Sequence, residues 1–196
     1  TVHRKPLILV TMSSSEIRTV LVGLGVRGET WSTVCANTES IALVAAVDKN
    51  PAMLAKHKSG VPLYEEFDDA LEATDPDAVI IATPPETHYE IASKALSASK
   101  HVLCEKPLSY KMGQVIKLVE LAERNNVNLL VGMNFRHLST SQMIRNYSLN
   151  QTLGPLSHGQ FSYLRYRDGN RTDLNKYPLQ MAYPMLFEQS IHHFDL

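Results

Sequence analysis

The sequence of 196 residues contains few cysteines, with only Cys35 and Cys104. Two cysteines cannot form a disulfide framework, so we interpret both as buried thiols and predict a protein of the reducing cytoplasm. No apolar run approaches the roughly 20 residues that a membrane span needs, and the N-terminal apolar run is too short for a signal peptide. We therefore expect no membrane partner.

An excess of charge of one sign is also lacking, because the formal net charge is −1 and the basic residues are scattered along the chain. A nucleic-acid-binding protein usually carries a basic patch or stripe, so we expect no nucleic-acid partner. The sequence shows no repeat of fixed period and no low-complexity linker. Its composition, 44% hydrophobic and 20% charged, is that of an ordinary globular chain.

Short apolar runs alternate with segments of helical pattern over the first two thirds of the chain. We predict strands over residues 17–23, 41–48, 77–83, 101–107 and 128–135. We predict helices over residues 27–37 and 109–125. We predict three more: one that begins at Pro51, one within residues 65–74 and one that ends at about Ser99. One stripe of the helix over 109–125 is expected to carry Val115, Leu118, Val119 and Ala122. The alternation predicts an α/β fold, a doubly wound parallel sheet with helices on both faces.

Gly23, Gly25 and Gly28 have the spacing G-x-G-x-x-G after the first predicted strand, and Asp48 ends the next strand. The first glycine permits a tight turn, the second lets the backbone approach a pyrophosphate, and the third allows close packing of helix and sheet. A carboxylate at Asp48 can accept hydrogen bonds from ribose hydroxyls and repels a 2′-phosphate, which favours NAD over NADP. Arg27 can assist either cofactor. A purely structural turn is the disfavoured alternative, because strand, loop, helix and acid occur together.

Glu105, Lys106 and Pro107 follow the predicted strand that begins at His101. Ligands of open α/β sheets bind at the carboxyl ends of the strands, so we expect this segment to lie beside the dinucleotide. A lysine shielded from water in that position can take part in proton transfer. An ordinary surface lysine in a loop is the alternative.

Glu188, His192 and Asp195 have the spacing i, i+4 and i+7 near the C-terminus, which places them on one face of a predicted helix. Carboxylates on both sides of His192 can influence the charge state of its imidazole. The same pattern also fits a polar helix face that contacts solvent. These three side chains could also bind a metal ion. Since the sequence offers no persuasive additional ligands, we expect no metal site.

The stretches GLGVRG (23–28), ATPPETH (82–88) and HVLCEKPLS (101–109) resemble the Gfo/Idh/MocA family of NAD(P)-dependent oxidoreductases. The resemblance extends from about Ile17 to the C-terminus. It implies NAD as the cofactor, with NADP possible, and a cis peptide bond between Lys106 and Pro107. For His88, a capping or surface position is an equally good interpretation. Together, the motifs and the resemblance give these cofactor-binding candidates: Gly23, Gly25, Val26, Arg27, Gly28, Asp48, Thr83, Pro84, His88, Glu105 and Lys106.

The resemblance also implies transfer of hydride between nicotinamide and a secondary alcohol of a sugar, inositol or related polyol. Lys106 and His192 would then form the acid–base pair. An NAD-dependent glycosidase of the same fold and a non-catalytic dinucleotide-binding sensor or subunit are the alternatives. The substrate contacts that we expect, from the resemblance or from position alone, are Arg136, Tyr163, Arg165, Glu188 and Asp195.

These observations divide the sequence into three parts. We interpret residues 1–15 as a disordered N-terminal extension and residues 16–135 as a dinucleotide-binding Rossmann domain. The resemblance implies that residues 136–196 begin an incomplete α+β domain for substrate binding and dimerisation, and that the full-length protein is a homo-oligomer. Residues 157–167 alternate as a solvent-contacting strand does. We expect weak or no turnover from the chain as given.

Overall fold

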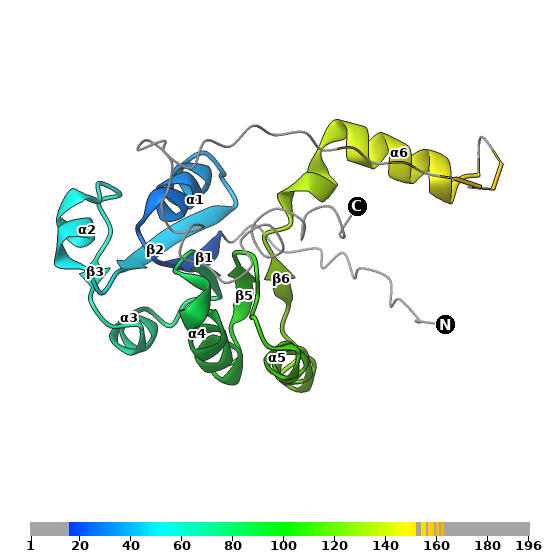
Figure 1. Cartoon of the computed structure of the whole chain (residues 1–196). Coiled ribbons are helices and arrows are strands. Elements are labelled where there is room, and N and C mark those ends of the chain that lie inside the picture. Colours follow the sequence, from blue (N-terminus) through cyan, green and yellow to red (C-terminus); the bar gives the residue numbers. More distant parts are fainter. Residues whose placement is uncertain (1–15, 152–153, 156, 159, 161, 163–196) are drawn as a thin grey trace, which may run out of the picture.

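The computed structural model describes residues 16–151, 154–155, 157–158, 160 and 162. Within them, six parallel strands form one sheet in the order β3-β2-β1-β4-β5-β6 (Figure 1). The strands are β1 (Ile17–Val22), β2 (Ile41–Val47), β3 (Leu63–Tyr64), β4 (Ala78–Ile81), β5 (His101–Cys104) and β6 (Leu129–Val131). The strand order confirms the predicted Rossmann sheet, whose winding reverses between β1 and β4.

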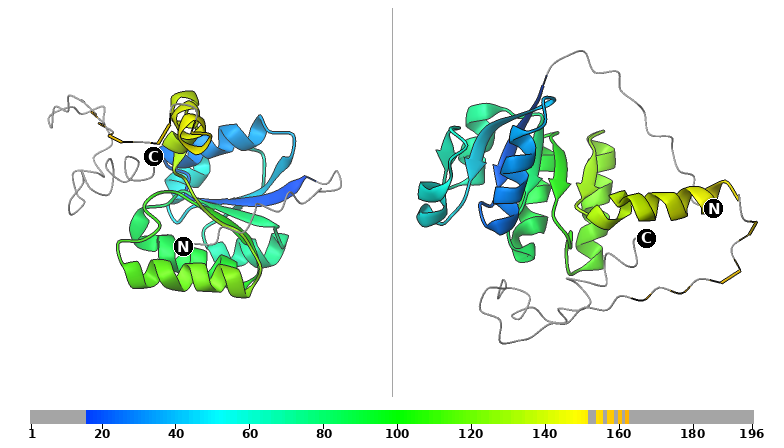
Figure 2. Two further views of the ribbon diagram at one scale, coloured as in Figure 1. Left: turned by 90° about the vertical axis from the view of Figure 1, so that its right-hand side faces the viewer. Right: turned by 90° about the horizontal axis from the view of Figure 1, so that it is seen from above.

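The helices lie on both faces of this sheet, as predicted (Figures 1 and 2). They are α1 (Val26–Ala36), α2 (Pro51–Lys56), α3 (Phe67–Thr74), α4 (Pro85–Ser97), α5 (Met112–Arg124), the 3-10 helix η1 (Asn134–His137) and α6 (Ser139–Leu149). Two of them, α1 and α2, pack on one face, whereas α3, α4 and α5 pack on the other. This arrangement follows from right-handed crossovers that run in opposite directions from the centre of the sheet.

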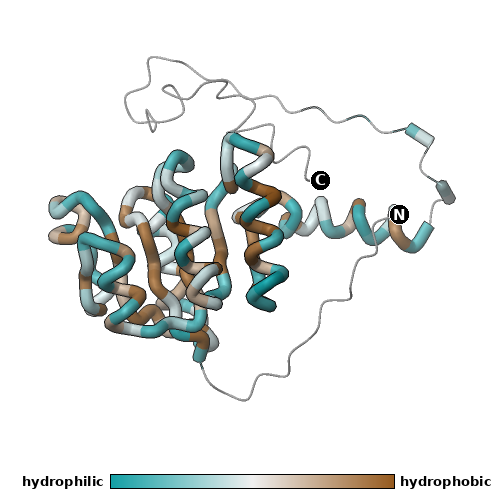
Figure 3. The backbone as a smooth tube through the Cα atoms, turned by 90° about the horizontal axis from the view of Figure 1, so that it is seen from below, coloured by the Kyte–Doolittle hydropathy of each residue, from teal (hydrophilic) through white to brown (hydrophobic). Residues whose placement is uncertain are grey.

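The hydrophobic core is divided between the two faces because successive strand residues point to opposite sides. In β1, Val20 and Val22 belong to the group beneath α3, α4 and α5, whereas Leu21 belongs to the group beneath α1 and α2. Figure 3 shows the hydrophobic strands behind helices in which hydrophobic and hydrophilic residues alternate. Both thiols are free and buried, as predicted: Cys35 faces the sheet from α1, and Cys104 ends β5.

Several boundaries differ from the predictions at points where the backbone turns. The strand predicted over 101–107 ends at Cys104, because the chain then turns toward Pro107, which has no N–H group for a strand ladder. The strand predicted over 128–135 ends at Val131 and is followed by η1. Val119, predicted to lie on the buried stripe of α5, is 44% exposed, while Leu118 is fully buried. Val115 and Ala122 pack against the core as predicted, and Leu121 takes the place of Val119 on the packing side of this helix.

Besides η1, two elements were not predicted, and both lie at an edge of the described structure. The strand β3 has only two residues and extends the sheet beyond β2. The helix α6 follows η1 and projects past the β6 edge (Figures 1 and 2). None of the helices in the described part of the chain is both long and apolar enough to cross a membrane.

Candidate dinucleotide-binding site

The carboxyl ends of five strands are aligned in register. Val22 pairs with Val47 on one side and with Ile81 on the other, Ile81 pairs with Cys104, and Cys104 pairs with Val131. The residues that follow these strands therefore form a row across one edge of the sheet: Gly23, Asp48, Ala82, Glu105 and Gly132. In open α/β sheets this edge is the place where ligands bind, and the reversal between β1 and β4 lies at its centre.

Each glycine of the loop has a different steric environment. Gly23 has φ +94°, and a Cβ there would lie 2.7 Å from the Ala82 carbonyl carbon and from the Thr83 nitrogen. At Gly28 a Cβ would lie 1.9 Å from the Gly23 carbonyl oxygen, so α1 and the end of β1 pack backbone against backbone. At Gly25, by contrast, a Cβ would meet nothing within 4 Å. The first and third glycines are thus required by the fold, and the second one borders open space.

That open space lies at the N-terminus of α1, where Gly25 is the N-cap residue and supplies no capping side chain. Val26 is 77% exposed there, and Arg27 is exposed beside it. Unpaired N–H groups and the dipole of a helix N-terminus attract phosphate groups. A pyrophosphate therefore fits this position, where a side chain at residue 25 would occupy part of the space.

Asp48 is held in a fixed orientation at the end of β2. One carboxylate oxygen accepts a hydrogen bond from the backbone N–H of Leu24 at 2.8 Å, and the other accepts from the backbone N–H of Asn50 at 2.8 Å. The side chain thereby ties the glycine loop to the turn after β2. Each oxygen keeps a further lone pair, so the carboxylate can also accept hydrogen bonds from two ribose hydroxyls.

Beneath the turn after β4 lies His88, which is fully buried. This burial contradicts the surface alternative, because the ring lies between two backbone carbonyl oxygens. Nε2 is 2.8 Å from Thr83 O, and Nδ1 is 2.8 Å from Pro107 O. Since carbonyl oxygens only accept hydrogen bonds, the ring donates to one or both of them and links the two loops. Thr83 is half-buried above it and Pro84 is exposed.

The segment after β5 is buried, which excludes the surface alternative for Lys106. Glu105 is 7% exposed and Lys106 is 9% exposed, and the Lys106–Pro107 peptide bond is cis, as the resemblance implied. One oxygen of Glu105 accepts a hydrogen bond from Nε1 of Trp31 at 2.9 Å and lies 3.6 Å from Nε of Arg27. Burial, together with the neighbouring Glu105 carboxylate, raises the pKa of the Cys104 thiol. Cys104 is therefore an unreactive core residue.

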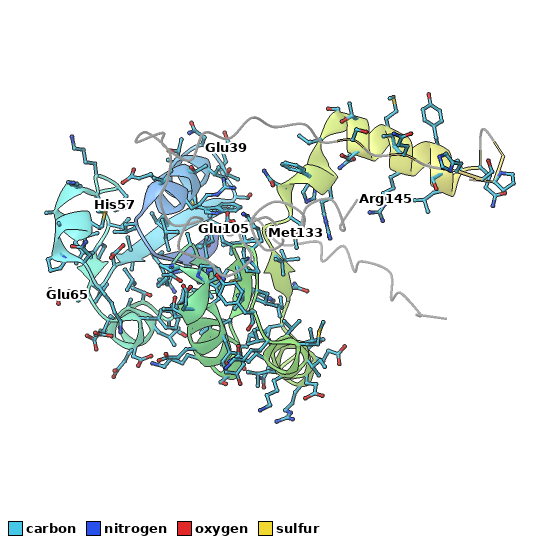
Figure 4. All side chains as sticks on the ribbon, viewed as in Figure 1. Glu39, His57, Glu65, Glu105, Met133 and Arg145 are labelled. Atoms are coloured by element: carbon cyan, nitrogen blue, oxygen red, sulfur yellow. The ribbon has the colours of Figure 1, made fainter. Side chains whose placement is uncertain are left out.

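A cleft of about 270 Å³ opens between α1 and the segment that follows β6. Figure 4 labels two of its lining residues, Glu105 beside α1 and Met133 in the segment that follows β6. Arg136 is exposed on η1, and its neighbours Asn134 and His137 line the cleft. Trp31 was not predicted as a partner of Glu105. Its spacing of four residues from Arg27 places both side chains on one face of α1, but no spacing in the sequence links that face to Glu105.

The other predicted site residues lie outside the described part of the chain: Tyr163, Arg165, Glu188, His192 and Asp195. The predicted strand over 157–167 falls largely in the same region. Among the described residues, no group of three or more histidine, cysteine, aspartate or glutamate side chains could hold a metal ion.

The strand order, the glycine cradle and the acid at the end of β2 define a dinucleotide-binding α/β protein. Residues 17–133, more than half of the chain, match the oxidoreductase family with an NAD-binding Rossmann fold, Gfo/Idh/MocA. The chain belongs to this family.

Comparison with individual proteins agrees with this assignment. The chain is 29% identical over 137 residues to glucose-6-phosphate 3-dehydrogenase of Bacillus subtilis, covering 68% of this chain and 38% of the relative. It is 27% identical over 168 residues to a glycosyl hydrolase family 109 protein of a Shewanella strain, covering 80% of this chain and 37% of the relative. The chain thus spans less than two fifths of the length of either relative.

A solved structure shows the same fold. Scyllo-inositol dehydrogenase from Lactobacillus casei, with bound NAD(H) and scyllo-inositol, superposes with a TM-score of 0.66 at 29% identity. The superposition covers 71% of this chain and 43% of the dehydrogenase.

Proposed function

We propose that this chain provides the cofactor-binding part of an NAD-dependent oxidoreductase that acts on a secondary alcohol of a sugar, inositol or related polyol. The row of residues after the strand ends carries this proposal, because it combines the glycine loop and Asp48 with Glu105, which the buried Lys106 follows at the same edge of the sheet. The names of two similar proteins, an inositol dehydrogenase and a sugar phosphate dehydrogenase, support the substrate class.

Each side chain has a defined task in this proposal. The backbone of residues 25–28 binds the pyrophosphate, and Asp48 binds the ribose hydroxyls. Lys106 and His192 exchange the hydroxyl proton of the substrate, while NAD, when bound, supplies the acceptor for the hydride. The substrate-binding residues proposed on the same basis are Arg136, Tyr163, Arg165, Glu188 and Asp195.

The charges around Asp48 support a preference for NAD over NADP. A 2′-phosphate beside the Asp48 carboxylate would be repelled unless a nearby cation compensated for it. The neighbouring Lys49 has its ammonium group 3.7 Å from Glu66, and Arg27 of the loop lies beside Glu105 instead. Both cations therefore already have a carboxylate partner.

A titration with NADH and, separately, with NADPH tests the cofactor assignment. Trp31, the single tryptophan, lies on α1, so we expect its emission to be quenched as NADH binds. Asp48→Asn is expected to weaken NADH binding about tenfold or more, because hydrogen bonds to a charged group are lost. Glu39→Gln removes one carboxylate just before β2, at the opposite edge of the sheet, and serves as the matched control. Absence of NADH binding by the folded chain would contradict the proposal.

The second candidate is an NAD-dependent glycosidase, which the name of a similar protein suggests: a glycosyl hydrolase family 109 protein that matches 80% of this chain. The two activities differ in the balance of the cofactor. A dehydrogenase accumulates NADH as a polyol is oxidised. A glycosidase whose NAD accepts the hydride and then returns it to the sugar releases its leaving group without net formation of NADH. Incubation with NAD and either a polyol panel or nitrophenyl glycosides separates them.

A further inference from the structure

The buried carboxylate of Glu105 belongs to the residue just before the proposed lysine, and it contacts α1. It is 7% exposed at the end of β5, and its Oε1 atom receives the Trp31 indole N–H at 2.9 Å. The same oxygen lies 3.6 Å from Nε of Arg27, whose side chain is 48% exposed. A buried carboxylate without partners would be strongly disfavoured, so these two groups of α1 account for its presence there.

The two partners come from one side of one helix. Arg27 and Trp31 are four residues apart and therefore lie one above the other on α1. Arg27 belongs to the glycine loop itself, and Trp31 lies one turn beyond it. In the sheet, β4 separates β1 from β5, so the contact joins the helix after β1 to a strand two positions away.

The second carboxylate oxygen of Glu105 lies near the backbone of the following residue. Oε2 lies 3.4 Å from the backbone nitrogen of Lys106. Across from it, a Cβ on Gly132 would lie 3.4 Å from the carboxylate, at the lower limit of ordinary van der Waals contact, so residue 132 borders this oxygen directly. The carboxylate thus lies between α1 and the backbone at Lys106.

We propose that Glu105 is a positioning residue, which acts through Trp31 and Arg27 to fix the N-terminal turn of α1 relative to Lys106. This inference rests on the proposed function and replaces direct cofactor contact as the role of Glu105. The pyrophosphate cradle and the proton-transferring lysine belong to different loops, and the carboxylate keeps them at a constant separation. Loss of the contact lets the two loops move independently, so the cofactor binds less tightly.

A double-mutant cycle on NADH affinity tests this role. Glu105→Gln keeps the shape of the side chain but removes its charge, and Trp31→Phe removes the donor while keeping an aromatic ring. Each single variant is expected to weaken NADH binding about fivefold or more, and the double variant about as much as the stronger single one, because one contact is lost in all three. NADH fluorescence or calorimetry measures the affinity, since Trp31→Phe removes the tryptophan signal.

Thr33→Ala is the matched control, because Thr33 is an exposed residue of the same helix and does not line the cleft. It is expected to leave the affinity unchanged. The indole N–H gives one proton resonance in this chain, which has a single tryptophan. That resonance is expected to shift in Glu105→Gln and to stay in place in Thr33→Ala. Urea unfolding of every variant shows whether the fold is retained.

Three outcomes would overturn the inference. If the loss of NADH affinity in the double variant equals the product of the two single losses, Glu105 and Trp31 act separately. A loss in Glu105→Gln with no loss in Trp31→Phe would mean that the carboxylate contacts the cofactor directly. An indole resonance that does not move in Glu105→Gln would mean that the contact is absent in solution. Failure of the proposed function is distinct, because the unmodified chain would then not bind NADH at all.

Discussion

Replacement of single glycines separates what the loop does for the fold from what it does for the cofactor. In Gly28→Ala, the new methyl group would lie 1.9 Å from the carbonyl oxygen of Gly23, whereas ordinary contacts begin at about 3.4 Å. The atoms that the methyl group would meet, the carbonyl oxygen and carbon of Gly23, belong to the backbone at the junction of β1 and α1. They cannot rotate away as a flexible side chain could. The helix must move away from the sheet.

The size of the effect follows from overpacking. Extra methyl groups in a packed core typically cost about 1–3 kcal/mol, and this contact is at the upper end because backbone must shift. Alanine in place of glycine within a helix returns about 1 kcal/mol. A net loss of about 2 kcal/mol should lower Tm by roughly 4–8 °C for a domain of this size.

Gly25→Ala provides the comparison within the same loop. A Cβ there would meet nothing within 4 Å, and the backbone has φ −70°, which alanine also adopts. We expect Tm to change by less than about 2 °C, since the predicted stability change is below about 0.5 kcal/mol. NADH binding should nevertheless weaken about tenfold or more, because the methyl group occupies the space proposed for the pyrophosphate.

Differential scanning fluorimetry and the NADH titration together give the result. The expected pattern is a large Tm loss in Gly28→Ala and a binding loss without a Tm loss in Gly25→Ala. An unchanged Tm in Gly28→Ala would refute the backbone packing described for this loop. Unchanged NADH affinity in Gly25→Ala would refute the position assigned to the phosphates.

Three further predictions concern buried side chains. His88→Ala should reduce the unfolding free energy in urea by about 3 kcal/mol, because it removes a buried ring and leaves two carbonyl oxygens without their partner; a loss below about 0.5 kcal/mol would contradict this. The raised pKa of Cys104 keeps its thiol protonated in the folded state, so this residue's stabilising contribution is complete below about pH 8.5 and falls as the pH rises above it. Cys104→Ala should flatten that decline, and thiol reagents should label Cys104 only after unfolding. Leu118→Ala should cost about 3 kcal/mol, whereas Val119→Ala should stay within about 0.5 kcal/mol; equal effects would restore the predicted stripe.

The main elements of the sheet and the glycine loop were predictable from the sequence because their signals are local. The apolar runs of β1, β2, β4 and β5 each end at a glycine, an acid or a turn, and α1 follows its glycine motif directly. Pro51 and Pro85 stand at first helical positions, where their fixed φ and missing N–H fit. Because strand signals and helix signals alternate with short connections, the sequence also predicted the doubly wound parallel sheet.

The parts that could not be predicted depend on distant contacts or have weak patterns. The partner of Glu105 is 74 residues away in the chain, so no local spacing joins it to Trp31. The helix α6 lacks a buried face among the described residues, and Met143, Ile144 and Tyr147 remain exposed on it. Val119 has the correct helical spacing, but the direction from which α5 approaches the sheet is a tertiary property.

The candidate site is formed by separate turns that side chains from other elements tie together. Asp48 holds the glycine loop through Leu24, and His88 joins Thr83 to Pro107. Glu105 joins the end of β5 to α1. Each of these three side chains has hydrogen-bonded protein partners on a neighbouring loop or helix, so its position is set before a cofactor arrives. The proposed phosphate cradle, ribose-binding acid and lysine therefore belong to one set of interlinked loops, although they follow three different strands.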